Sequence, residues 1–118
     1  MSYFHSQRRL ILLWDGAEDG ITDNFYEYQC PICSEVSSFT FADAVEFMTL
    51  SADLRTYLVA NNLVSEGQFG YEVKKGTSAY CISLTCNSCK NNIWLIVGIK
   101  EIQPQRYNCY LKSIISNN

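Results

Sequence analysis

Cysteines are the residues of this chain whose type and spacing best support chemistry. Four of the six form two C-x₂-C steps, Cys30-Pro31-Ile32-Cys33 and Cys86-Asn87-Ser88-Cys89. At this spacing a tight turn directs two thiolates at one metal ion, and four such sulfurs complete a tetrahedral zinc site. We therefore expect a structural Zn²⁺ held by Cys30, Cys33, Cys86 and Cys89. Four thiolates fill the coordination sphere, which disfavours a catalytic metal because no position remains for a reactive water.

The segments around the two cysteine pairs must position these sulfurs. Residues 25–40 and 79–100 each read as two strands joined by a cysteine turn. This arrangement resembles the zinc-ribbon fold group, in which two such turns (knuckles) face each other across one zinc. The resemblance implies the same four-cysteine ligand set. It names no activity, because zinc ribbons serve transcription, translation and scaffolding alike.

Two other uses of the same sulfurs are disulfide bonds and an iron–sulfur cluster. The first residues do not form a signal-peptide pattern, because Arg8 and Arg9 precede only the short apolar run 10–14. We therefore expect a cytoplasmic protein with reduced thiols. Ribbon spacing between strands favours zinc over an iron–sulfur cluster.

The remaining pattern predicts one α+β domain over residues 1–118, built on an antiparallel sheet. Residues 10–14 predict a buried strand, and the acidic, glycine-containing stretch 15–20 predicts an exposed loop. Residues 69–74 and 79–85 flank a glycine turn and predict a hairpin. The stretch 93–99 is apolar on both faces and predicts a central strand, followed by a last strand over 106–115.

Between the two cysteine pairs the period changes, and we expect a helical insert over about residues 41–62. Thr40 resembles an N-cap, and Ala44, Val45, Phe47 and Met48 recur at helical spacing. A second helix begins after Ser51 and ends at residues 61–62. One bent helix and two short helices fit this pattern equally well.

The other potential catalytic residues carry no motif. His5 is the single histidine and is read as a frayed surface residue. No nucleophile–base set, P-loop or dinucleotide-binding fingerprint is present, so we expect no enzymatic activity. Cys81 and Cys109 lie in predicted strands and are read as packing residues.

Charge is unevenly distributed along the chain, whose formal net charge is −3. All nine charged residues between Leu10 and Leu54 are acidic, and the nine basic residues lie outside this stretch. Segregation of this kind can give a negative surface that steers a basic partner, or the two kinds of segment can neutralise each other in the fold. The candidate partner-binding residues are Asp15, Glu18, Asp19 and Asp23.

Three functions follow from these observations. The chain resembles, in general character, the small acidic immunity proteins of bacteria, which implies a non-enzymatic protein-binding domain that neutralises a basic toxin such as a nuclease. Trp14, Phe25 and Tyr26 are then candidate anchors, although they serve equally well as core.

The alternative is a nucleic-acid-binding or transcription-associated ribbon that uses basic residues beside tyrosines, namely Lys74, Lys75, Lys90, Lys100, Arg106 and Lys112 with Tyr71, Tyr80 and Tyr110. The third is a scaffold with an architectural zinc.

Overall fold

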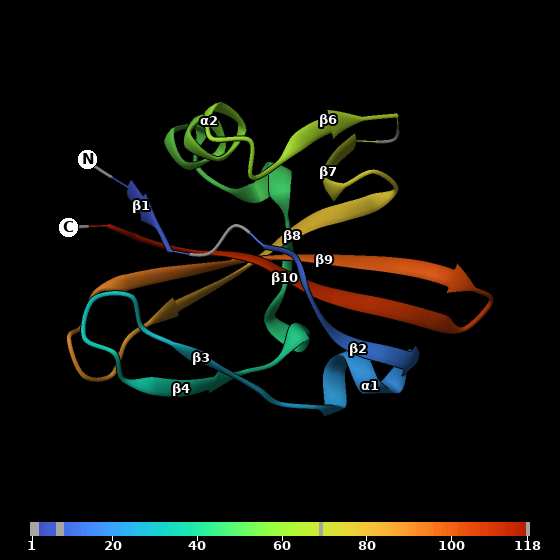
Figure 1. The fold of residues 1–118 in the computed structure, drawn as a ribbon, viewed down its shortest axis with the longest axis horizontal. Helices are drawn as coiled ribbons and strands as arrows, with labels where there is room; N and C mark the ends of the chain where they lie inside the picture. The colour runs from blue at the N-terminus through green and yellow to red at the C-terminus, as the bar shows by residue number, and fades with distance from the viewer. Residues whose placement is uncertain (1–2, 7–8, 69, 118) are drawn as a thin grey trace.

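Two long strands, β9 (Asn92–Gln103) and β10 (Arg106–Asn117), form the centre of the fold (Figure 1). The computed structural model describes residues 3–6, 9–68 and 70–117. Over these residues the main sheet is antiparallel, with strand order β1-β10-β9-β8-β7-β6, while β2 also pairs with β10 and β5 also pairs with β8. The other strands of this sheet are β1 (Tyr3–His5), β2 (Ile11–Ala17), β5 (Val45–Glu46), β6 (Ser65–Gly67), β7 (Gly70–Lys74) and β8 (Thr77–Thr85).

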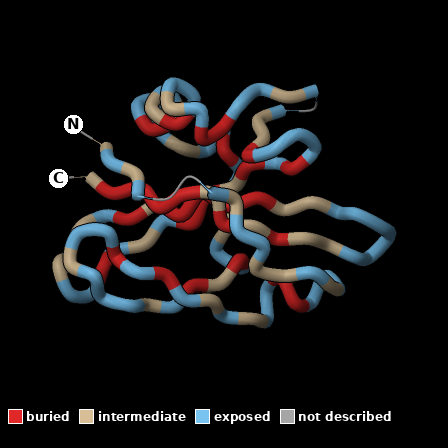
Figure 2. The backbone as a smooth tube through the Cα atoms, viewed as in Figure 1, coloured by how far each residue is buried: buried red, intermediate tan, exposed pale blue. Residues whose placement is uncertain are grey.

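Both faces of this sheet are covered, so the molecule has two hydrophobic cores. Alternate residues of β8 point to opposite faces: Ile82 belongs to one core, and Ala79 and Cys81 belong to the other. The buried residues are concentrated along the central strands (Figure 2). The apolar character of β9 on both faces is confirmed, because Leu95 belongs to the first core and Ile96 to the second.

The first face is covered by a separate two-stranded sheet and a short helix. This sheet consists of β3 (Tyr26–Gln29) and β4 (Val36–Phe39), and α1 (Asp19–Asp23) precedes it. Phe39 and Phe41 pack with Ile82 of the main sheet in the first core. Because the cysteine turns of β3–β4 and β8–β9 lie at the same end of the molecule, the two cysteine pairs can meet (Figure 1).

The second face is covered by α2 (Ala52–Ala60) and the segment that follows it. Leu54 and Leu58 of α2 are buried with Leu63 and Val64 against the main sheet. The helix begins as predicted, since the Ser51 hydroxyl accepts a hydrogen bond from the backbone N–H of Leu54.

The expected long helical insert over residues 41–62 is wrong, because α2 is its only α-helix among the described residues. In place of a first helix the chain forms the 3₁₀ turn η1 (Phe41–Asp43), the strand β5 and the 3₁₀ turn η2 (Phe47–Thr49). Thr40 does cap, but it caps η1. Val45 and Glu46 then pair with Cys81 and Tyr80 of β8, so sheet hydrogen bonding replaces the helix that the apolar spacing indicated.

The segment expected to be a buried strand and an exposed loop is also different. Strand β2 continues to Ala17, through part of the predicted loop, and α1 begins at Asp19. Ile11 and Leu12 are exposed because β2 lies at an edge of the sheet, paired with β10.

Within the described ranges, no helix is long and apolar enough to cross a membrane.

Candidate metal centre

Four cysteine sulfurs meet where the β3–β4 and β8–β9 turns face each other. The Sγ atoms of Cys30, Cys33, Cys86 and Cys89 all lie within 4.8 Å of one another. Two of these contacts link the two turns: Cys30 Sγ to Cys89 Sγ is 3.8 Å, and Cys33 Sγ to Cys86 Sγ is 3.5 Å. All four are free thiols. The tertiary structure thus brings together the four cysteines expected to act as ligands.

The two turns have the same backbone conformation. In the first, the N–H of Cys30 donates to the carbonyl of Glu35 at 2.9 Å, and the N–H of Ser34 donates to the carbonyl of Cys30 at 2.9 Å. In the second, the N–H of Cys86 donates to the carbonyl of Asn91 at 3.0 Å, and the N–H of Lys90 donates to the carbonyl of Cys86 at 2.9 Å. The matching hydrogen bonds make the turns equivalent knuckles, and each fixes two sulfurs on the same side of its hairpin.

Backbone amides point at the sulfurs. The N–H groups of Cys89 and Ser88 hydrogen-bond to the Cys86 sulfur and lower its pKa. The backbone and side chain of Asn91 hydrogen-bond to the Cys89 sulfur and lower its pKa to about 6. These donors favour the thiolate, the form that binds metals, and they fix its direction as outer-shell partners of a metal site do.

Of the four candidate ligands, Cys30 is the one whose pKa is most affected by burial. It is 2% exposed, and burial raises its pKa to about 11, against the opposing effect of the backbone N–H groups of Cys33 and Ile32. A cation among the sulfurs would remove this cost, because metal binding displaces the thiol proton. Without one, only the two backbone N–H groups compensate the charge of a buried Cys30 thiolate.

The spacing of the sulfurs fits a tetrahedral ion. With metal–sulfur bonds of about 2.3 Å, tetrahedral geometry places sulfurs about 3.8 Å apart. The observed 3.8 and 3.5 Å contacts are close to this value. Four sulfurs from two rigid turns can therefore hold a metal ion with every coordination position filled by protein.

The candidate partner-binding residues lie at the other end of β2, and they do not all share one environment. Asp15 forms a two-pronged ion pair with Arg106, at 2.9 and 3.0 Å, across β2 and β10. This hydrogen bond to Arg106 lowers the pKa of Asp15. Asp15 is therefore already engaged within the fold, whereas Glu18, Asp19 and Asp23 are exposed in and before α1.

The fold adds Glu101 to this group, which the sequence reasoning missed. Glu101 pairs with Tyr107 across β9 and β10, and Tyr107 pairs with Gly16 of β2. Burial, a hydrogen bond to Glu101, and the charges of Glu101 and Glu18 all raise the pKa of Tyr107. Glu18, Asp19, Asp23 and Glu101 are called the acidic end below. The proximity of Glu101 depends on the β2–β10 pairing, which no local signal in the sequence indicates.

The proposed aromatic anchors have different environments. Trp14 lies against Gly16 and Gly20 and donates from Nε1 to the carbonyl of Ala17 at 3.1 Å. Tyr26 packs against the first core, with its ring 5.8 Å from that of Phe39. Phe25, beside Asp23 and Asn24 in the chain, is 72% exposed. Of the three, Phe25 is the ring available to a partner.

The remaining cysteines and the histidine have structural roles in the fold. Cys81 and Cys109 are fully buried, one in each core, and burial raises their pKa values to about 12 and about 11. The expectation that His5 is a frayed surface residue is wrong: it belongs to β1, pairs with Ile115, and its ring nitrogen hydrogen-bonds to the Tyr57 hydroxyl.

The basic residues considered for nucleic-acid binding are divided among several places. The Lys74 ammonium lies over the Tyr110 ring, 5.7 Å from its centre. Arg106 is paired with Asp15, and Lys90 belongs to the second knuckle.

Comparison of the chain with family models, curated proteins and solved structures gives no match in any of the three. The interpretation of the fold and of the metal centre therefore depends on their own geometry.

Proposed function

We propose that this protein is a non-enzymatic protein-binding domain whose two layers are joined by a structural zinc ion. The observation that carries the zinc is the convergence of four sulfurs from two equivalent knuckles. Zinc suits this set because four thiolates in tetrahedral geometry are its usual structural site. The ion would join the β3–β4 layer to the main sheet and contribute folding energy directly.

The acidic end is the surface we assign to the partner. Its four carboxylates are exposed, and the Arg106 guanidinium of β10 is already paired with Asp15. Lys100 is the neighbour of Glu101 in β9, and the acids of this region outnumber these two cations. Negative charge that is not compensated locally raises the association rate of a basic protein and excludes acidic ones. The exposed Phe25 ring next to this charge supplies an apolar anchor of the kind that dominates many interfaces. A basic toxin such as a nuclease fits this chemistry.

The test is capture of partners from the source cell by two immobilised forms of the protein. One is the wild type, and the other carries Asp19→Lys and Asp23→Lys at the acidic end. The matched control is Glu35→Lys, which reverses an exposed charge beside the first knuckle. A basic protein should be retained by the wild type and the control, lost from the double variant, and released by added salt.

The identified partner is then purified and titrated against the same three proteins. If it is a nuclease, its hydrolysis of nucleic acid should also be inhibited. Equal affinity of the wild type and the double variant for the partner would refute the assignment of the acidic end. An active nuclease in the saturated complex would refute inhibition.

Nucleic-acid binding is the second candidate, favoured by the position of Lys74 over Tyr110. An aromatic ring beside a cation can stack a base while the cation contacts phosphate. A gel-shift assay at low salt, with single- and double-stranded probes, tests this directly. Binding at micromolar protein that is lost in Lys74→Glu would favour it over the protein-binding function, and the absence of a shift would reject it.

A further inference from the structure

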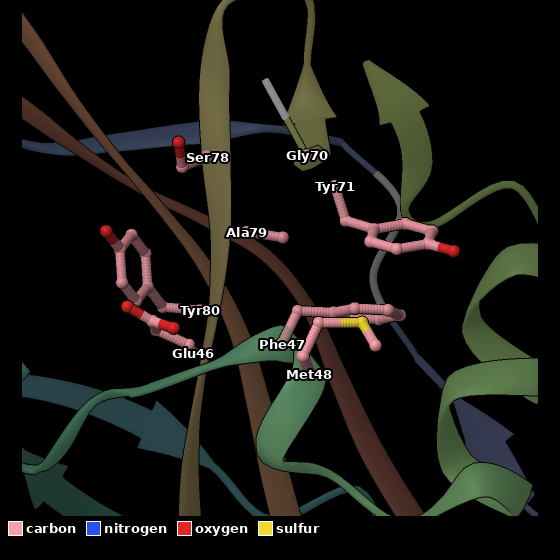
Figure 3. Close-up of a pocket in the computed structure, with 8 residues that line it drawn as sticks. All are labelled: Glu46, Phe47, Met48, Gly70, Tyr71, Ser78, Ala79 and Tyr80. Carbon is pink, nitrogen blue, oxygen red and sulfur yellow. The ribbon is translucent and has the colours of Figure 1, made fainter. Parts of the chain in front are cut away.

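A cleft interrupts the outer edge of β8, on a part of the molecule that neither the metal centre nor the acidic end uses. Strand β7 pairs with β8 at Thr77 and Ser78, and β5 pairs with it at Tyr80 and Cys81. Ala79 lies between the two pairings, and the cleft above it has a volume of about 400 Å³ (Figure 3). We call this the edge cleft.

The walls of the edge cleft are aromatic on both sides of β8. On one side, the rings of Phe47 and Tyr71 pack with their centres 4.5 Å apart, and Met48 lies beside them, 57% exposed. On the other side stand Tyr80 and Glu46, which are direct cross-strand neighbours of β8 and β5. Alternation along β8 explains this division, because Ala79 and Tyr80 point to opposite faces of the sheet.

Charge in the edge cleft has one sign. Glu46 is the one charged residue that lines the cleft among the described residues, and it is exposed. Outside the lining, the Arg55 guanidinium of α2 already contacts the Met48 sulfur, with Nη1 3.8 Å from Sδ. The side of the cleft that is open to a further cation is therefore the side of Glu46 and Tyr80. The faces of aromatic rings are electronegative and attract cations, and a methionine sulfur is polarizable. The Glu46 carboxylate beside the Tyr80 ring therefore favours a cation and disfavours a phosphate or carboxylate.

The opening limits what can enter. Ser78 and Tyr80 bound the gap along the strand, and at about 3.3 Å per residue their Cα atoms are about 7 Å apart. An additional strand needs several consecutive free backbone positions, which this edge does not offer between β7 and β5. One long side chain inserted end-on fits the gap better than a strand.

We propose that the edge cleft binds the cationic head of a lysine or arginine side chain presented by a protein partner. This inference rests on the proposed function, since it takes the cation from the basic partner. The ammonium or guanidinium group would lie against the Tyr80 ring and pair with the Glu46 carboxylate on one side of β8, with its alkyl stem reaching across Ala79 along Phe47 and Met48. Such a contact would give specificity, while the acidic end provides long-range attraction.

The first experiment uses small cations and needs no partner. The protein is titrated with N-acetyl-lysine methylamide and N-acetyl-arginine methylamide while backbone amide NMR shifts are recorded. N-acetyl-norleucine methylamide, which has a similar stem and no charge, is the control ligand. The cationic probes should shift the amides of Gly70, Ala79 and Tyr80 more than norleucine does. Glu46→Gln should weaken this binding about threefold or more, while Glu35→Gln, at an exposed residue of the first knuckle, leaves it unchanged.

Equal shifts with the charged and uncharged probes, or binding that Glu46→Gln does not weaken, would overturn the inference. The same variant then separates it from the proposed function. One outcome is that the partner binds Glu46→Gln as tightly as wild type and fails to bind the double variant Asp19→Lys, Asp23→Lys. In that case the proposed function stands and the edge cleft inference falls. If the small cations bind in a Glu46-dependent way and no basic partner exists, the cation specificity stands and the proposed function falls.

Discussion

Ser34 and Lys90 occupy the same position in the two knuckles, each directly after the second cysteine of its pair. Both have a left-handed backbone, with φ of 66° and 65°. This conformation lets each residue donate its N–H back to the first cysteine of its knuckle, Cys30 or Cys86. A side chain in this region crowds the backbone, whereas glycine adopts it freely. The two knuckles therefore contain the same strained position, occupied in neither case by glycine.

Replacing these residues with glycine should stabilise the protein. Ser34→Gly and Lys90→Gly should each raise the free energy of unfolding by about 0.5–1 kcal/mol, because relief of the left-handed strain exceeds the added chain entropy of the unfolded state. Urea unfolding of the metal-loaded protein measures this. Ser38→Gly in strand β4 is the control, and it should destabilise. A loss of stability in both knuckle variants would contradict equivalent strain at the two positions.

Metal removal should separate the two layers of the fold. Without the ion, the β3–β4 hairpin loses its link to β8–β9, and we expect the free energy of unfolding to fall by about 3 kcal/mol or more. Elemental analysis of the reduced protein should find one zinc per chain, and hydrogen exchange should show loss of protection first in β3 and β4. Cys33→Ser should behave as the chelated protein does, whereas Cys81→Ser should retain the metal. A metal-free wild type that keeps full stability would refute a structural zinc.

The buried Cys81 thiol should make the protein sensitive to alkali. Burial raises its pKa to about 12, so the folded state keeps the proton that the unfolded state loses near pH 9. Above about pH 9 the unfolded state binds fewer protons, and this site should lower stability by up to about 1.4 kcal/mol per pH unit until its folded pKa is reached.

Cys81→Ala isolates that contribution. The variant should be less stable than wild type at pH 8 because it leaves a cavity, and the difference should shrink as pH rises towards 10.5. Urea unfolding at a series of pH values gives both curves. A difference that stays constant with pH would show that the Cys81 thiol does not titrate as its burial implies.

Gly20 should resist substitution because Trp14 occupies the space beside it. A Cβ at Gly20 would lie 2.0 Å from Cζ2 of the Trp14 indole, and the hydrogen bond from Nε1 to Ala17 fixes the ring. Alanine favours a helix by about 0.5–1 kcal/mol over glycine. Overpacking costs about 1–3 kcal/mol, so Gly20→Ala should destabilise overall.

A double-mutant cycle tests the cause of that loss. In a Trp14→Leu background the smaller side chain leaves room, and Gly20→Ala should then be neutral or stabilising. Thermal unfolding of the four proteins measures the coupling. The same cost in both backgrounds would place its origin outside the Trp14 contact.

The sequence alone determined the local parts of this protein. The two C-x₂-C steps identified the four sulfurs that meet, since the spacing by itself sets which thiols a tight turn can present together. The helix that begins after Ser51 and the long apolar strand through residues 93–99 also followed from local pattern.

The tertiary structure decided the rest, because it depends on contacts between residues far apart in the chain. Val45 recurs with its apolar neighbours at helical spacing, but pairing with β8 makes Val45 and Glu46 a strand and creates the edge cleft. In the sequence, nothing distinguishes Asp15 from its acidic neighbours. Pairing of β2 with β10 places Arg106 beside Asp15, and the same pairing brings Glu101 to the acidic end. Local periodicity records the preferences of a segment, whereas pairing across the sheet is set by the partner strand and by the burial that both gain.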